Sequence, residues 1–298
     1  MNALDWSRLT GLRLRARAVS DGLVLGAHAS RRRGGGVEFS GHRAYVPGDD
    51  LRLIDRRVMA RHDRPYIREV ETDTDRTLWL VVDASASMGF RGEGSATTKL
   101  EYASVVAAAL ARVATAGGDP VGLTILGSPA SITRPTRGAQ GFERVVAALE
   151  ATRAAGDLSV DGAALDRALF PVAERGRPGS VIVLLSDLID THEALMRRFL
   201  ALSTRRRTPV VARVLDPEEA TFPFADPVRL VAVEGAYEVE TNPDAVRAGY
   251  LDALAETTAL WSSRLIERGG RLVPATTDRD PVAVVRQILG AALGGVAA

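Results

Sequence analysis

Two carboxylates in this chain follow stretches in which every residue is apolar. Asp83 comes directly after residues 78–82, and Asp187 comes after residues 181–185 with Ser186 between. Ser85 and Ser87 then alternate with alanines behind Asp83. Because residues two apart face the same way in an extended loop, Asp83, Ser85 and Ser87 can point into one pocket.

These side chains offer only oxygen atoms, which suits a hard divalent cation such as Mg²⁺ or Mn²⁺. We therefore predict a metal site formed by Asp83, Ser85, Ser87 and Asp187. Since hydroxyl ligands are neutral, the ion would keep positive character and attract a carboxylate of a partner protein. The alternative is that both aspartates cap the helices that follow and the serines bond to loop amides.

The pattern of the remaining chain predicts how these residues are positioned. Apolar stretches with strand character alternate with helical patterns from residue 77 onward, which favours βαβ units and a mostly parallel sheet. Strands that are apolar at every position are typical of a sheet covered on both faces. We expect an α/β fold, a three-layer doubly wound sandwich, in which ligands bind beyond the carboxyl ends of the strands.

The expected elements can be given by residue range. Strands are predicted at 78–82, 121–126, 181–185, 209–215 and 271–275, with a hairpin at 229–240; helices are predicted around 6–19 and at 98–116, 141–152, 162–175, 192–205, 244–268 and 281–293. Thr98 and Glu101 form a capping-box pattern at the start of the second helix. The segment 216–228 has no predicted path.

Two motifs make the sequence recognisable. Asp83-Ala-Ser-Ala-Ser resembles the metal-ion-dependent adhesion site of von Willebrand factor type A domains, and Ser186–Asp187 matches that site's last element. Upstream, residues 41–55, with 60–61 and 66–69, resemble the bacterial family called domain of unknown function 58. The resemblance implies a type A-like domain over residues 77–298, preceded by an irregular N-terminal extension with short strands over residues 1–76.

The family resemblance also implies a role. Its members are thought to act with MoxR-type AAA+ ATPases as chaperone-like or assembly factors, so we expect a non-enzymatic interaction module that binds such an ATPase and a client carboxylate. The sequence departs from the pattern at Arg56, where the family usually has Trp. The loop threonine of the adhesion site is also unmatched: Ser159 or Asp161 would supply an oxygen there, whereas Ala163 would not.

Charge is unevenly distributed along the chain. Residues 1–70 hold 14 Arg against 8 Asp and Glu, although the whole chain has a net charge of only +1. The arginines at 43, 52, 61 and 68 alternate with acids at 49, 50, 55 and 69. This pattern fits an internal ion-pair network or a docking face for the ATPase.

Composition excludes several other functions. The chain has no Cys and four His, none four residues from another, which argues against thiolate and His-based metal sites. Nucleic acid is not expected as a partner, given near-neutral charge and 5% aromatic residues. No apolar stretch is long enough for a membrane span and no signal peptide is evident, so we expect a cytoplasmic protein.

The alternative from a different class is an Asp-dependent phosphotransferase or hydrolase of α/β type. Such enzymes use an Asp at the end of the first strand, as Asp83 is, but they also need a second Asp two residues on, where this chain has Ser85. Lys99 lies too early in the chain for the usual lysine, and His192 is at a predicted helix start. No P-loop or nucleophile-elbow motif is present.

Overall fold

The structure, a computed structural model, describes residues 6, 9–28, 39–44, 66–70, 76–127, 129–157, 162–189, 193–203, 206–226, 228–231 and 238–294. The chain divides into two units. One comprises residues 1–25 and 75–298, and the other comprises residues 26–74. The sequence predicts an N-terminal extension of residues 1–76. In the structure the separate unit comprises residues 26–74, and residues 1–25 belong to the unit that contains residues 75–298.

The larger unit is built on a six-stranded sheet with the strand order β10-β7-β6-β3-β4-β5. Its strands are β3 (Leu78–Asp83), β4 (Val121–Leu126), β5 (Ser131–Thr136), β6 (Val181–Ser186), β7 (Thr208–Leu215) and β10 (Arg271–Thr276). All neighbours pair in parallel except β5, which runs antiparallel to β4 at one edge. The predicted mostly parallel sheet is confirmed.

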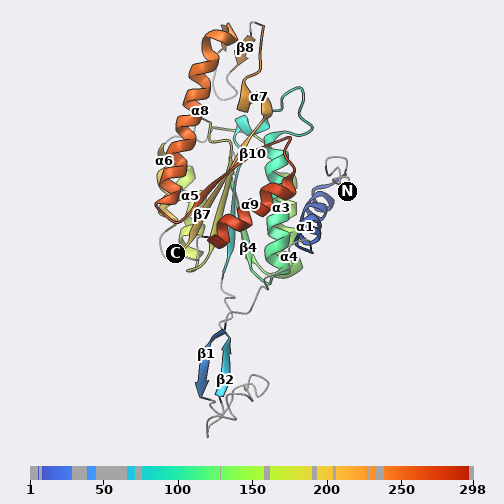
Figure 1. Ribbon diagram of the computed structural model, residues 1–298, viewed down its shortest axis with the longest axis vertical. Helices are drawn as coiled ribbons and strands as arrows, with labels where there is room; N and C mark the ends of the chain where they lie inside the picture. The colour runs from blue at the N-terminus through green and yellow to red at the C-terminus, as the bar shows by residue number, and fades with distance from the viewer. Residues whose placement is uncertain are drawn as a thin grey trace. The chain divides into compact units, whose positions relative to one another are not determined.

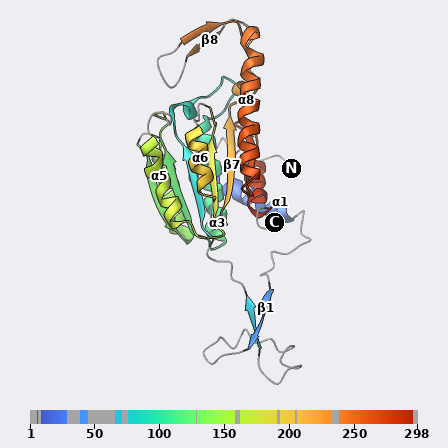
Figure 2. The same cartoon turned by 90° about the vertical axis from the view of Figure 1, so that its left-hand side faces the viewer.

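Helices cover both faces of this sheet (Figures 1 and 2). Helices α1 (Leu12–His28), α3 (Lys99–Ala116), α4 (Gly138–Ala151) and α9 (Pro281–Gly294) lie on one face, and α5 (Gly162–Arg175), α6 (Glu193–Ala201) and α8 (Pro243–Ile266) lie on the other. Each face has its own apolar core, one around α3 and one around Trp79, Phe199 and Trp261. The predicted three-layer sandwich is confirmed.

Local sequence explains the best-defined elements. All six residues of β3 and of β4 are buried, since helices cover both sides of these strands. Thr98 caps α3 by accepting from the Glu101 N–H, and the Glu101 side chain accepts from the Thr98 N–H, as the capping-box pattern predicts. Asn242 caps α8, whose first residue is Pro243.

Three elements were not predicted at these positions. The edge strand β5 lacks a buried face, so its sequence carries no strand pattern. The unplaced segment after β7 begins with the short helix α7 (Pro217–Thr221), whose N-cap is Asp216. Helix α1 begins and ends later than the predicted 6–19.

The remaining strands form two hairpins. In the larger unit, β8 (Val228–Val231) pairs antiparallel with β9 (Glu238–Thr241), in agreement with the predicted hairpin. In the smaller unit, β1 (Phe39–Ala44) pairs antiparallel with β2 (Tyr66–Val70). The remainder of the family motif, and the side chains of its proposed ion-pair network, lie outside the described residues.

Candidate metal and binding site

The four predicted ligands come from the carboxyl ends of two neighbouring strands. Strands β3 and β6 are parallel, with Val82 opposite Leu185, so Asp83 and the Ser186–Asp187 pair leave the sheet at the same edge. The predicted convergence of Asp83 and Asp187 at one edge is thus confirmed. Both side chains are almost fully buried, with 1% of each residue exposed.

Asp83 is held by three donors. Its Oδ1 accepts from the Ser85 N–H at 2.9 Å and from Ser85 Oγ at 2.7 Å. Its Oδ2 accepts from Ser186 Oγ at 2.6 Å. These bonds fix the carboxylate relative to both strands, because its two oxygens are bound from the β3 loop and from the end of β6.

The loop after β3 presents its serines to the same place. Ser85 Oγ and Ser87 Oγ lie 3.1 Å apart. Ser85 is buried, whereas Ser87 is partly exposed. The loop continues as a 3₁₀ turn, η3 (Ala86–Gly89). Backbone bonds fasten it to the segment after α4: the Ala155 N–H donates to the Ala84 carbonyl and the Ala86 N–H to the Gly156 carbonyl, at 2.8 and 2.9 Å.

The site carries excess negative charge. The pKa of Asp83 is raised to about 6, first by burial and then by the nearby Asp187 carboxylate, although the hydrogen bonds from Ser186 and Ser85 oppose the rise. Two acids that repel each other inside a protein favour the arrival of a positive charge. A cation at this position would relieve that repulsion.

Part of that positive charge is already supplied by Lys99, the first residue of α3. Its Nζ lies 2.7 Å from Asp187 Oδ2 and 2.6 Å from Glu219 Oε1 of α7. The side chain is completely buried. Burial alone would lower the pKa of Lys99, but the two carboxylates outweigh burial and raise the pKa, so the ammonium stays charged.

Sequence reasoning did not place Lys99 or Glu219 in the site. Lys99 is 88 residues from Asp187 along the chain and Glu219 is 120 residues from Lys99. A lysine at the start of a helix normally extends into solvent, so its residue type and position gave no signal. For Glu219 a local signal exists, because Asp216, Pro217 and Glu219 form a capping-box pattern.

The oxygen arrangement is compatible with a small divalent cation. Neighbouring ligands of octahedral Mg²⁺ lie about 3 Å apart, given Mg–O distances of about 2.1 Å. The separations of 2.7 Å between Asp83 Oδ1 and Ser85 Oγ and 3.1 Å between the two hydroxyls are close to that value. Asp187 is less available as a ligand, because its Oδ2 is bound to Lys99 and its Oδ1 accepts a hydrogen bond from the Ile189 N–H at 3.0 Å.

Other candidate ligands do not add to the set. Ser159 and Asp161 lie outside the described residues, as does His192. Ala163, in the first turn of α5, has no oxygen in its side chain. Among the described residues no three acidic or histidine side chains group as a metal cage, so an ion here would depend on the hydroxyls of Ser85 and Ser87.

A cavity of about 530 Å³ borders this part of the molecule. It lies between α1, the start of α3 and the end of α4, and Gly89 and Ala154 form part of its lining. Gly89 ends the turn that carries Ser87, and Ala154 immediately precedes the segment bonded to Ala84 and Ala86. The cavity therefore adjoins the loop that carries the predicted ligands.

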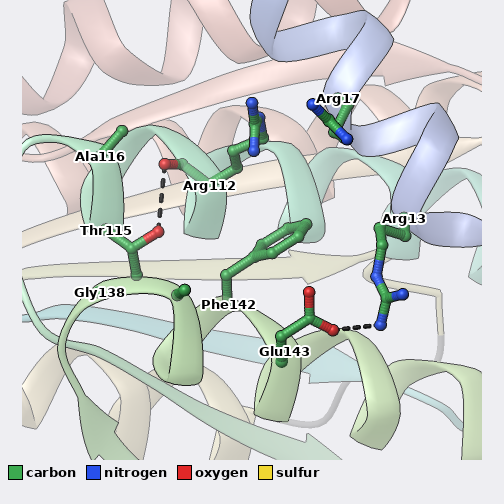
Figure 3. A pocket seen from close by; sticks show the side chains of 9 residues that line it. Arg13, Arg17, Arg112, Thr115, Ala116, Gly138, Phe142 and Glu143 are labelled. Atoms are coloured by element: carbon green, nitrogen blue, oxygen red, sulfur yellow. Dashed lines mark hydrogen bonds and ion pairs between the residues drawn. The ribbon is translucent and has the colours of Figure 1, made fainter.

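A second cavity, of about 280 Å³, has a different character (Figure 3). Arg13 and Arg17 of α1 and Arg112 of α3 line it together with Phe142 and Glu143 of α4. Arg13 is paired with Glu143, and the Arg112 Nε donates to Ser20 Oγ at 2.9 Å. None of the four predicted ligands lines this cavity.

The mostly parallel sheet, covered by helices on both faces, carries two buried acids at the carboxyl ends of neighbouring strands. The chain belongs to the family described as "Protein of unknown function DUF58", whose model matches residues 41–259. It is also 31% identical to the uncharacterized protein Rv1480 of Mycobacterium tuberculosis, over 97% of this chain and 90% of that protein.

Solved structures with similar folds were also found. An aerotolerance-related membrane protein from Bacteroides fragilis is 15% identical, with a TM-score of 0.45, over 73% of this chain and 98% of that one. The conserved hypothetical protein BatB from Bacteroides thetaiotaomicron is 16% identical, with the same TM-score and coverage. In the described part of the present chain, no helix is both long and apolar enough to traverse a bilayer.

Proposed function

We propose that this protein is a non-enzymatic interaction module that holds Mg²⁺ or Mn²⁺ at Asp83, Ser85, Ser87 and Asp187. With the ion bound, the site offers a partner's carboxylate a positively charged position to coordinate. The single observation that supports this most is the meeting of two buried aspartates and two hydroxyls at one edge of the sheet.

The chain's own residues would each have a defined part. Asp83 contributes negative charge and is oriented by Ser186. Ser85 and Ser87 contribute neutral oxygens 3.1 Å apart, and Ser87, the more exposed of the two, is nearer to an incoming partner. The adjoining cavity between α1, α3 and α4 would accommodate partner residues that flank the carboxylate.

We further propose that the partner is a MoxR-type AAA+ ATPase, with a client protein supplying the carboxylate. What supports this proposal is the resemblance of residues 41–55, 60–61 and 66–69 to a family whose members are thought to act with such ATPases. The cytoplasm is the corresponding expected location.

The geometry supports binding better than Asp-dependent phosphoryl transfer. A nucleophilic carboxylate must present an oxygen to the substrate. It also needs a second Asp two residues on, and that position is held by Ser85, whose hydroxyl donates to Asp83 Oδ1 at 2.7 Å. Phosphatase turnover that disappears in an Asp83→Asn variant would favour the enzyme.

Co-purification tests the proposal. The tagged wild-type chain should retain the purified ATPase in buffer with Mg²⁺ and release it when EDTA is added. Asp187→Asn should weaken retention, whereas Asp252→Asn, an exposed acid on α8, should behave as the wild type. Retention that is unchanged by EDTA and by Asp187→Asn would contradict the proposal.

A further inference from the structure

Lys99 occupies an unusual place for a lysine. It is the only lysine in the chain, and none of its side chain is exposed. An ammonium is buried in this way only when it is paired and hydrogen-bonded, because its desolvation is otherwise very costly. Lys99 meets that condition through Asp187 and Glu219, with both oxygens within 2.7 Å of Nζ.

The ammonium leaves the charge at this edge only partly balanced. Asp83, Asp187 and Glu219 contribute three carboxylates, against one positive charge from Lys99. Lys99 contacts two of the three acids, and the donors to Asp83 are a neutral amide and neutral hydroxyls. The uncompensated charge is therefore concentrated at Asp83, beside Ser85 and Ser87.

From this arrangement we propose that Lys99 is a resident cation that sets how tightly the site binds a divalent ion. Its ammonium is bound to Asp187 Oδ2 and balances part of the negative charge that an ion at this edge would meet. This inference rests on the proposed function, since it concerns the same site, and it adds the residue that controls metal affinity.

The position of Lys99 also connects the site to α7. Glu219 lies in α7, and two more residues at the start of that helix bind the loop that precedes α3. Asp216 Oδ2 accepts from the Gly92 N–H at 3.0 Å, and Glu218 Oε1 accepts from the Glu93 N–H at 2.8 Å. These bonds fix the start of α7 against that loop, and Glu219 of α7 lies beside Lys99.

A purely structural ion pair and a resident cation predict different results for Lys99→Met. Methionine has a similar unbranched length without the charge. If Lys99 only supports the fold, the variant loses stability and gains nothing. If Lys99 competes with the metal, its removal exposes two carboxylates and the variant binds divalent ions more tightly, because a like charge within a few ångströms has been removed.

Calorimetric titration with Mn²⁺ alone distinguishes these cases. We expect Lys99→Met to bind Mn²⁺ more tightly than the wild type by about tenfold or more. Lys99→Arg, which keeps the charge, should bind as the wild type does. In EDTA, Lys99→Met should have a lower melting temperature than the wild type. Addition of Mn²⁺ should raise the melting temperature of Lys99→Met by more than it raises that of the wild type.

Should Lys99→Met fail to fold in EDTA, Lys99→Gln provides the same test, because its neutral amide still donates to Asp187 or Glu219. If Lys99→Met and Lys99→Gln bind Mn²⁺ no more tightly than the wild type does, the inference is overturned, but the proposed metal site is not contradicted. Mn²⁺ binding by Lys99→Met or Lys99→Gln but not by the wild type supports the inference and contradicts the proposed function. Absence of binding in every variant contradicts both.

Discussion

Ser186 Oγ donates a hydrogen bond to Asp83 Oδ2 at 2.6 Å, and this bond joins the ends of two neighbouring parallel strands. The two residues are 103 positions apart in the chain. Because β3 and β6 are central strands covered by helices on both faces, the strand ends have little freedom to separate. The hydrogen bond therefore joins the two strand ends at the carboxylate edge.

A first test concerns how tightly β4 packs against β3, the strand that carries Asp83. A Cβ added at Gly122 would lie 2.6 Å from the ring of Trp79, which is fully buried. We expect Gly122→Ala to lower the free energy of unfolding by about 1–3 kcal/mol, as overpacking of a core does. Urea unfolding followed by circular dichroism measures the change.

A matched glycine serves as the control. Gly249 lies within α8, and a Cβ there would meet no heavy atom within 4 Å. Gly249→Ala should therefore raise the free energy of unfolding by up to about 1 kcal/mol, since alanine is the better helix former. Equal effects from the two substitutions would show that the contact with Trp79 is not restrictive.

The start of α3 gives a second test, because it positions Lys99. Thr98 Oγ1 accepts from the Glu101 N–H at 3.1 Å, so Thr98→Ala removes the cap. The expected loss is about 1 kcal/mol of unfolding free energy. Thr98→Ser keeps an equivalent hydroxyl and should restore most of it, whereas failure of serine to do so would argue against the capping role.

The pKa of Asp216 predicts a pH dependence. Burial alone would raise this pKa, but hydrogen bonds from Ser95 and from the Glu218 and Gly92 amides outweigh it and hold the pKa below its usual 3.8. A lowered native pKa means that the ionised group stabilises the fold above the unfolded pKa, and that this contribution is lost as pH falls through the native pKa.

Asp216→Asn isolates that contribution. At pH 7 the variant should be less stable than the wild type, and the difference should shrink below about pH 4 as the wild-type carboxylate becomes protonated. Urea midpoints measured between pH 3 and pH 7 give the comparison, with Asp252→Asn as an exposed control. A difference that does not change with pH would mean that the charge of Asp216 is not what stabilises α7.

The sequence predicted the central sheet and the meeting of Asp83 with Asp187 because both depend on local patterns. A fully apolar strand that ends in an acid places that acid at the carboxyl edge, and neighbouring parallel strands share that edge. Strand β5 was not predicted, since its residues are exposed or half-buried and show no alternation. Its pairing with β4 is decided by tertiary contact.

The Lys99 contacts could not be predicted for a related reason. They join three segments that are distant in sequence, and no residue near Lys99 indicates which acids it reaches. Helix α7, by contrast, carried a readable signal in Asp216, Pro217 and Glu219. The boundary of the N-terminal extension depends on how α1 packs, which its short amphipathic pattern does not specify.

Titration of the purified protein with Mn²⁺ tests the central claim most directly. The account predicts that the wild type binds Mn²⁺ and that Asp83→Asn loses the binding while its circular dichroism spectrum is retained, because Asn still accepts a hydrogen bond at that position. Asp252→Asn should bind as the wild type does. Unchanged Mn²⁺ affinity in Asp83→Asn would contradict the proposed site.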